Sequence, residues 1–600
     1  MGSGLLFVII FALFAAACPT GDGTENNTSQ PGQPEQPEQP GGAGSEPVTG
    51  NTDTENANAV ITLKGTTAEF TGANVNIATN NVYGTIVEIT GNGTYVIQGT
   101  LNQGFVAVSK KDLDVTIVLN GVNIFCKNYA ALTCLKKSNV TLVLAKDSVN
   151  YLTDGGEGMV NNKYPLGYDD EEQPNAALLI RRNLTIKGSG KLYVNGNGNN
   201  GIGSRANLKI EDGDITVTAL KNALKGNDSI AVSGGRFNLV SGNDAIITEE
   251  IDDGMGAINI TGGEFVITAV NDAVQASTSL TVSNAAFTIK TGGGSNVAAI
   301  TGSAKGLKAG SAALTIHSGT FNIDSNDDSV HSDGTITING GTFTISSGDN
   351  AIRADERLTI NSGTINISKC YEGLESLNID LNGGFVKIKA SDDGINIAGG
   401  KDSSAANPNP GGGWKPGRPG GSQVIDGMLT ITGGEYRIES SGDGLDSNGN
   451  IRMEGGAVVI FGPASTSTPE VPIDYNGAFV MTGGLIVALG NNGSMLQQPG
   501  SSSTQNSFLF KSSSTPVSAG SLINVSSSSG TEVVTVRTIG ATRSLVVCSP
   551  LLARGTSYVI SSGGSYSGSE NELGLFEGGT YSGGSVLRTF TISNTTTTVN

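Results

Sequence analysis

Acidic side chains recur at one position of a repeated sequence pattern in the middle of this chain. Each repeat begins with a small residue, usually the second glycine of a pair, and the ninth residue after it is an acid or an amide in these repeats: Asp244, Asp272, Asp328, Asn350, Glu372, Asp393 and Asp443. The eighth position adds Asp327, Asp349 and Asp392, and the twelfth carries His331, Arg353, Glu375, Asn396 and Asp446. Carboxylates stacked at strand spacing repel one another, so they must be protonated, interleaved with amides or bridged by cations.

Some of this repulsion is relieved within the sequence itself. Asn350 and Asn396 interleave with the acids, and Arg353 and His331 balance part of the charge. No basic residue falls among six acids towards the C-terminal end of the series: Glu372, Glu375, Asp392, Asp393, Asp443 and Asp446. Calcium binds about six to eight oxygen ligands in flexible geometry. The sequence therefore predicts calcium held by these ligands: Asp327, Asp328, Asp349, Glu372, Glu375, Asp392, Asp393, Asp443 and Asp446.

A simpler interpretation is that Asp and Asn stand at these positions because they form good turns. Turn formation explains single Asp residues well, but it explains Glu372 and Glu375 poorly. Both interpretations require a fold in which the repeats stack.

The repeat itself indicates that fold. Its anchors are Gly190, Gly213, Gly235, Gly263, Ala285, Gly319, Gly341, Gly363, Gly384, Gly434, Gly456 and Gly484, with a base interval of 22 residues and longer intervals where segments are inserted. In one unit, apolar and polar residues alternate over 335–339, 342–346 and 357–360, which is typical of short strands with one buried face. Three strands per repeat, separated by turn residues, predict an all-β protein, a parallel β-helix with rungs of about 22 residues; precedent makes it right-handed.

The ends of the chain differ from this body. Residues 5–17 carry no charge and precede Cys18, which favours a lipoprotein signal peptide over 1–18 with Cys18 lipidated; an ordinary secretory signal is the alternative. Residues 19–58 are rich in Pro, Gln and Gly and predict a disordered linker. We expect the β-helix over 59–507 and a small C-terminal β module over 508–600, which either caps the rod or stands apart.

Composition narrows the function classes. A net charge of −19, from 35 basic and 54 acidic residues, argues against nucleic acid as a partner. Two histidines and five cysteines are too few for zinc fingers or a disulfide framework, so metal chemistry must use oxygen ligands. We expect Cys126 and Cys134 to be buried thiols rather than a bridge.

Several motifs resemble those of the bacterial family known as carbohydrate-binding domain-containing proteins, and the resemblance covers roughly residues 60–598. The motifs are 117–124, 174–177, 371–375, 391–396, the Gly/Pro-rich insertion at about 399–423, 441–449, 473–477 and 577–584. The resemblance implies a right-handed parallel β-helix akin to polysaccharide lyases, extracellular, binding calcium and plant-type polysaccharides such as cellulose or polygalacturonate, without established catalysis. Asn350 departs from the family, where Asp is common, and so does Cys370.

We therefore expect an exported, calcium-dependent carbohydrate-binding protein that is not an enzyme. It would be a monomer, lipid-anchored at the cell surface or outer membrane, with an acidic or plant-cell-wall polysaccharide as its partner. One alternative is a calcium-dependent, pectate-type polysaccharide lyase with Arg353 as its base, although Arg353 would more simply balance the acids. The other alternative is a structural adhesin without a sugar ligand.

Overall fold

The computed structural model describes residues 56–134, 136–156, 174–398, 424–464, 469–512 and 515–600. All of them belong to one compact unit, Ser45–Asn600. The described residues form strands and turns and no helix, so none of them lies in a helix able to cross a membrane. Cys18 lies outside the described residues.

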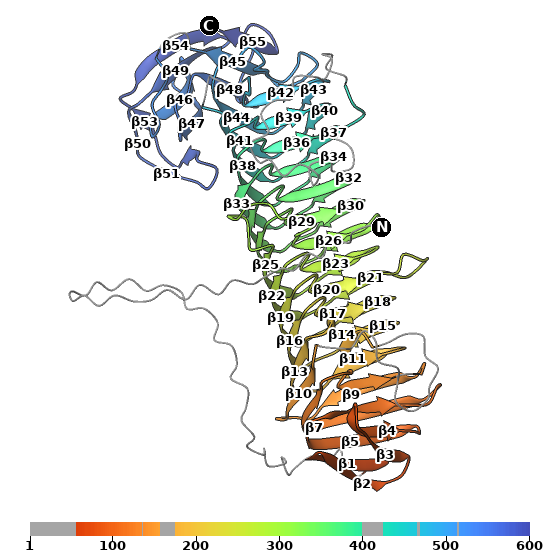
Figure 1. Cartoon of the computed structure of the whole chain (residues 1–600). Coiled ribbons are helices and arrows are strands. Elements are labelled where there is room, and N and C mark those ends of the chain that lie inside the picture. The colour runs from red at the N-terminus through yellow and green to blue at the C-terminus, as the bar shows by residue number, and fades with distance from the viewer. Residues whose placement is uncertain (1–55, 135, 157–173, 399–423, 465–468, 513–514) are drawn as a thin grey trace, which may run out of the picture. The chain divides into compact units, whose positions relative to one another are not determined.

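Most strands belong to three parallel stacks, which we call the first, second and third faces, and Figure 1 shows their rungs stacked in chain order. The first face contains β10 (Val149–Asp154), β13 (Lys191–Gly196), β16 (Asp214–Ala219), β19 (Arg236–Ser241), β22 (Gly263–Ala269), β25 (Ala285–Thr291), β28 (Gly319–Ser325), β31 (Thr342–Ser347), β33 (Thr364–Cys370), β35 (Phe385–Ala390), β38 (Glu435–Glu439), β41 (Ala457–Phe461) and β44 (Leu485–Gly490).

The second face contains β8 (Leu132–Cys134), β11 (Ala176–Ile180), β14 (Asn200–Ser204), β17 (Leu224–Gly226), β20 (Ile246–Thr248), β23 (Val274–Ala276), β26 (Leu307–Ala309), β29 (Val330–Ser332), β32 (Ile352–Ile360), β34 (Leu374–Leu381), β36 (Ile395–Ile397), β39 (Leu445–Ser447) and β42 (Ile473–Tyr475). The third face contains β9 (Asn139–Leu144), β12 (Leu184–Lys187), β15 (Asn207–Ile210), β18 (Ser229–Val232), β21 (Ala257–Ile260), β24 (Leu280–Val282), β27 (Ala313–Ile316), β30 (Thr335–Ile338), β37 (Met428–Ile431), β40 (Asn450–Met453) and β43 (Phe479–Met481), and the long strands β32 and β34 continue into it.

This arrangement is a parallel β-helix and confirms the predicted fold class. Each rung pairs with the next at equivalent repeat positions, so Phe321 pairs with Phe343 and Thr335 with Arg357. Like residues therefore stack over like, which gives a continuous core from rungs that could not bury their apolar faces alone. Ile345, predicted to point inward, has no exposed surface.

Stacked aromatic rings fill the corner where the first face begins. The rings of Phe237, Phe265, Phe287, Phe321 and Phe343 form a ladder with centroid separations of 4.5 to 5.6 Å and interplanar angles of 6° to 10°. These rings are buried. The ladder fixes the register of five successive rungs, because a slip by one residue would expose every ring.

Antiparallel strands begin and end the stack. At the N-terminal end, β1 (Ala59–Gly65) pairs with β2 (Thr67–Gly72), and β3 (Val75–Asn80) pairs with β4 (Gly84–Ile89). The parallel coils then start with β5 (Gly93–Leu101), β6 (Gly104–Val108) and β7 (Asp114–Cys126). Cys126 and Cys134 are buried and unbridged, as expected.

The C-terminal strands cap the end of the β-helix rather than forming a separate domain. Strand β48 (Ser544–Cys548) pairs antiparallel with β44 and with β45 (Ser507–Lys511), and β45 pairs with β55 (Thr596–Val599). A second sheet holds β46 (Leu522–Ser527), β47 (Glu532–Arg537), β49 (Ser557–Ser562) and β54 (Ser585–Thr591), and two small hairpins pair β50 (Ser565–Tyr566) with β53 (Tyr581–Ser582) and β51 (Ser569–Glu570) with β52 (Phe576–Glu577). One apolar cluster joins Phe461 and Leu489 of the helix to Phe508 and Val547 of the module.

Candidate metal centre

The acidic residues lie at the corner between the first and second faces, which we call the acidic corner. The backbone N–H that follows each ninth-position residue donates to the carbonyl of the equivalent residue one rung on, as in Gly373 N to Asp393 O at 3.0 Å and Gly394 N to Asp443 O at 2.8 Å. The structure therefore stacks these residues in one column. Lys305 also belongs to it, since the bonds Ala273 N to Lys305 O and Gly306 N to Asp328 O place it between Asp272 and Asp328.

One side-chain oxygen of several column residues has a structural role. Asp272 N donates to Asp244 Oδ1 at 3.0 Å, Asn350 N to Asp328 Oδ1 at 3.1 Å, and Asp443 N to Asp393 Oδ1 at 2.6 Å. A short side chain ending in oxygen satisfies a corner amide that would otherwise be buried without a partner. The turn interpretation thus accounts for one side-chain oxygen of such residues. The second oxygen is the one left for a cation or for another side chain.

A basic residue neutralises part of the corner. Lys305 Nζ lies 2.6 Å from Asp327 Oδ1 and 2.9 Å from Asp328 Oδ2, and only 7% of the Lys305 side chain is exposed. His331 Nδ1 lies 2.8 Å from Asp328 Oδ2. Burial would raise the pKa of Asp328, but Lys305 and His331 outweigh it and hold that pKa well below its ordinary value. Asp327 and Asp328 come together with Asp349, but the protein supplies a cation there itself.

Amides separate the next two acids. Glu372 Oε1 accepts a bond from Asn396 Nδ2 at 3.0 Å, while Asn350 Nδ2 donates to both Glu372 and Glu375. Arg353 Nε lies 3.0 Å from Glu375 Oε2. Burial, followed by repulsion from Glu375 and Asp393, raises the pKa of Glu372 well above its ordinary value.

The last rungs of the corner hold five carboxylates, which we call the carboxylate cluster: Asp393, Asp443, Asp446, Glu470 and Asp474. Ligand oxygens of Asp393, Asp443 and Glu470 lie within 4.8 Å of one another, and so do those of Asp443, Asp446 and Asp474. No basic side chain of the described residues forms an ion pair with any of the five. Glu470 and Asp474 are not among the predicted ligands.

Burial and charge repulsion raise the pKa values of carboxyl groups in this cluster. Burial, and next the neighbouring carboxylates, raise the pKa of Asp393 to about 8. Burial raises the pKa of Asp443 to about 9, with Asp393 and Glu470 adding to the rise. Burial and then repulsion from Asp474 raise the pKa of Asp446 to about 6. A divalent cation would favour the ionised form of all three.

A neutral oxygen next to the cluster also lacks a partner. Asn396 lies between Glu375 and Asp446 in the register of the second face and is 8% exposed. Its Oδ1 is buried and accepts no hydrogen bond among the described residues. Carboxylate and amide oxygens together are the donors that calcium prefers. The donor set of the cluster and Asn396 therefore fits a hard divalent cation.

Eight of the nine predicted ligands thus fall into three groups along the corner. Asp327, Asp328 and Asp349 come together beside Lys305; Glu372 and Glu375 lie among amides and Arg353; and Asp393, Asp443 and Asp446 belong to the carboxylate cluster. Asp392 precedes the cluster and accepts a hydrogen bond from the side chain of Tyr371, which helps to raise the pKa of Tyr371 after burial.

The protein is thus a parallel β-helix with a carboxylate-lined corner. Comparison with known proteins adds which sequences it resembles. The model of the family described as carbohydrate-binding domain-containing protein matches residues 83–351. Over this segment the chain is similar to that family, which confirms the resemblance expected from the sequence there. The carboxylate cluster lies outside the matched segment.

Two relatives extend this comparison. A carbohydrate-binding domain-containing protein of Acetivibrio thermocellus is 39% identical over 134 residues, which are 22% of this chain and 45% of that protein. The chain thus matches less than half the length of this relative. The solved structure of a polysaccharide lyase-like protein from C. thermocellum, a gadolinium derivative, is similar at 34% identity with a TM-score of 0.35, over 39% of this chain and 92% of that one.

Proposed function

We propose that this protein binds polysaccharides at the cell surface and that calcium held at the acidic corner supports the binding of acidic polysaccharides. The observation that carries the calcium proposal is the carboxylate cluster, five acids that pair with no base in the described part of the chain, beside the buried Oδ1 of Asn396, which has no hydrogen-bond partner there. The matched family segment supports carbohydrate as the class of ligand.

The cluster and Asn396 would hold the ion. Asp443 belongs to both groups of close oxygens, one with Asp446 and Asp474 and the other with Asp393 and Glu470. Bound calcium neutralises the stacked carboxylates and can share its remaining coordination positions with a uronate carboxylate.

An exposed aromatic ring stands beside these acids. Tyr371 is 48% exposed, and its side chain donates to Asp392. An aromatic ring with a fixed hydroxyl offers a sugar both an apolar face and a polar edge. Tyr371 is therefore the side chain from which we expect direct sugar contact next to the ion.

The position of Arg353, the base expected for a lyase, does not support the lyase alternative. Arg353 is 5% exposed and its Nε lies 3.0 Å from Glu375, so its guanidinium balances a carboxylate inside the corner. A base for β-elimination must reach the proton that it removes. Binding without catalysis is the function that we propose.

The location at the cell surface rests on the N-terminal sequence. A charge-free segment before Cys18 and the Pro- and Gln-rich segment behind it fit a lipidated, exported protein. This part of the proposal is independent of the acidic corner.

The binding proposal is tested with immobilised polygalacturonate and the full chain, in calcium and in chelator. We expect binding in calcium and at least tenfold weaker binding in chelator. Asp446→Asn combined with Asp474→Asn should lose the calcium-dependent part. Asp426→Asn combined with Glu435→Gln removes two exposed carboxylates elsewhere and should bind like the parent. Equal binding with and without calcium would refute the proposal.

A further inference from the structure

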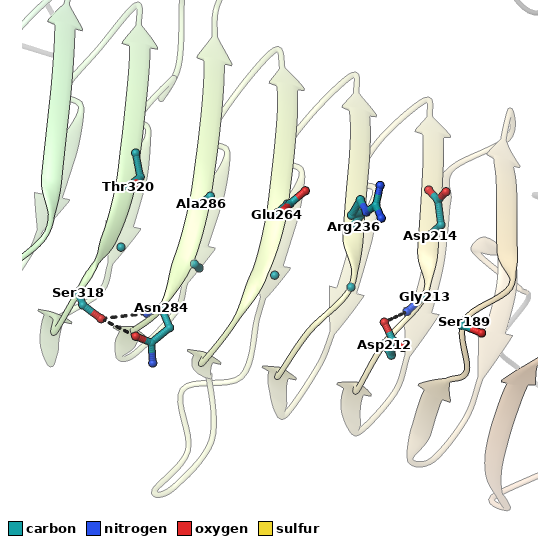
Figure 2. A pocket seen from close by; sticks show the side chains of 14 residues that line it. Ser189, Asp212, Gly213, Asp214, Arg236, Glu264, Asn284, Ala286, Ser318 and Thr320 are labelled. Atoms are coloured by element: carbon teal, nitrogen blue, oxygen red, sulfur yellow. Dashed lines mark hydrogen bonds between the residues drawn. The ribbon is translucent and has the colours of Figure 1, made fainter.

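A second polar surface lies at the opposite end of the first-face strands. It is a groove of about 770 Å³ at the corner between the third and first faces, and it runs from Ser189 to Thr320 over six successive rungs. Figure 2 shows its lining residues rising from neighbouring strands and from the turns before them. The acidic corner follows the C-terminal ends of the same strands, about 20 Å away for a strand of six residues.

Glycine forms the floor of this groove and cannot easily be replaced there. Gly213, Gly235, Gly263 and Gly319 have φ values of 136°, 103°, 109° and 133°, a region that favours glycine. A Cβ atom at Gly263 would lie 3.1 Å from Cε2 of Phe265, one of the stacked core rings. The floor is therefore a row of backbone next to the aromatic ladder, and its one side chain is the methyl group of Ala285, which pairs in register with Gly263 and Gly319.

Polar side chains repeat along the walls at the spacing of the rungs. Asp214, Arg236, Glu264, Ala286 and Thr320 occupy equivalent positions on paired strands. Ser189, Asp212, Asn284 and Ser318 line the other side. Ser318 Oγ donates to Asn284 Oδ1 at 3.0 Å and accepts from Asn284 N at 3.0 Å, so this part of the wall is fixed, as Figure 2 shows.

Two charged groups on one wall are available to a ligand. Arg236 and Glu264 are exposed neighbours on β19 and β22, yet they do not pair with each other, and neither forms an ion pair with any other described residue. A carboxylate accepts hydrogen bonds from hydroxyl groups, and a guanidinium donates to ring and hydroxyl oxygens. Both groups thus suit a ligand that is rich in hydroxyls.

The charge of the lining selects among such ligands. Asp214 is paired with Lys191, and the two remaining acids, Asp212 and Glu264, still outnumber Arg236, so the lining disfavours a polyanion. The next row of outward-facing side chains is uncharged: Thr216, Asn238, Val266, Thr288 and Asn322. Six rungs at about 4.8 Å span roughly 24 Å, enough for a chain of several sugar units lying along the stack.

We propose that this groove binds a neutral polysaccharide chain, extended along the stack of rungs, and that it does so without calcium. The inference deepens the proposed carbohydrate binding by adding a second site with a different ligand chemistry. The whole groove lies inside the segment 83–351 that matches the carbohydrate-binding family, whereas the carboxylate cluster lies outside it.

The test is calorimetric titration of cellohexaose, a neutral probe, into the full chain in the presence of chelator. We expect binding, and at least tenfold weaker binding for Ala286→Trp, because Ala286 is exposed and a large ring there would fill the groove. The matched control is Lys290→Trp, at an exposed position of the same strand outside the lining, which should bind like the parent.

Three results would overturn this inference: no binding of cellohexaose by the parent protein, unchanged binding by Ala286→Trp, or tighter binding of hexagalacturonate than of cellohexaose in chelator. A calcium titration of Ala286→Trp separates this test from the proposed function. Its calcium binding should equal that of the parent, because the two sites occupy different corners.

Discussion

The ammonium nitrogen of Lys305 lies 2.9 Å from Oδ2 of Asp328, inside the same column that places Asp393 and Asp443 further along the corner. Equivalent positions of one stack therefore differ in how their charge is balanced. The protein provides its own cation near Asp328, and the carboxylate cluster has no paired base among the residues that the structure describes.

Removing the internal cation should expose this difference. Lys305→Met leaves Asp327 and Asp328 buried without their ammonium partner, which should lower the free energy of unfolding by about 3 to 5 kcal/mol. Calcium should restore part of the loss, because ligand oxygens of Asp327, Asp328 and Asp349 lie close together and have then lost the ammonium group of Lys305. Urea unfolding with and without calcium measures both effects.

Lys308→Met is the matched control for that variant. Lys308 Nζ lies 3.3 Å from Asp272 Oδ2, and its side chain is 21% exposed, so the loss should be smaller. If Lys305→Met unfolded at the same urea concentration as the parent in chelator, the internal-cation account would be wrong.

Without calcium, the carboxylate cluster should make stability fall as the pH rises. The folded-state pKa values of about 8 for Asp393 and about 9 for Asp443 lie above an unfolded value of about 3.9. Their contribution is fully present below the unfolded pKa and is lost as the pH rises through the folded values. In chelator, the free energy of unfolding should decrease from pH 5 towards pH 9.

Calcium should flatten this pH dependence, because the ion favours the ionised carboxylates and releases protons when it binds. Urea unfolding across this pH range with and without calcium tests the prediction. If the free energy of unfolding changed equally with pH in calcium and in chelator, the pH dependence would not be due to a metal site.

The inward strand positions should tolerate no charge. Ile345→Asp places a carboxylate in the continuous core and should lower the free energy of unfolding by at least about 3 kcal/mol. Thr344→Asp, at an exposed position of the same strand β31, is the control and should change stability little. Thermal unfolding that is identical for Ile345→Asp and the parent would contradict the inward assignment.

The N-terminal prediction concerns residues that the structure does not describe. Cys18→Ala should move the protein from the membrane fraction to the soluble fraction, because it removes the residue expected to be lipidated. Thr20→Ala, two residues away, should stay with the membrane. Retention of Cys18→Ala in the membrane fraction would leave no role for a lipid on that residue.

The sequence was sufficient to predict the rungs and the stack, because alternation and a fixed interval report directly which side chains face inward. Ile345 and the residues of the acidic column follow from counting alone. Lys305 does not, because a long insertion after Ala285 separates it from its anchor by 20 residues instead of nine. The same kind of insertion hides Asp474, which pairs in register with Asp446.

Glu470 and the backbone role of the column could not be predicted in this way. Glu470 directly precedes Val471, whose carbonyl accepts the column bond from Gly444 N, but the insertion after Gly456 shifts it away from the count of eight residues. The bonds from corner amides to Asp244 and Asp328 depend on the geometry of the corner, which the residue pattern does not specify.

Calorimetric titration of calcium into the chelator-treated full chain tests the central claim most directly. We predict calcium binding with proton release, measured in buffers of different ionisation enthalpy, because the carboxyls of Asp393 and Asp443 are partly protonated near neutral pH. Asp446→Asn combined with Asp474→Asn should weaken it at least tenfold, and Asp426→Asn combined with Glu435→Gln should not. The absence of calcium binding to the parent protein would contradict the account.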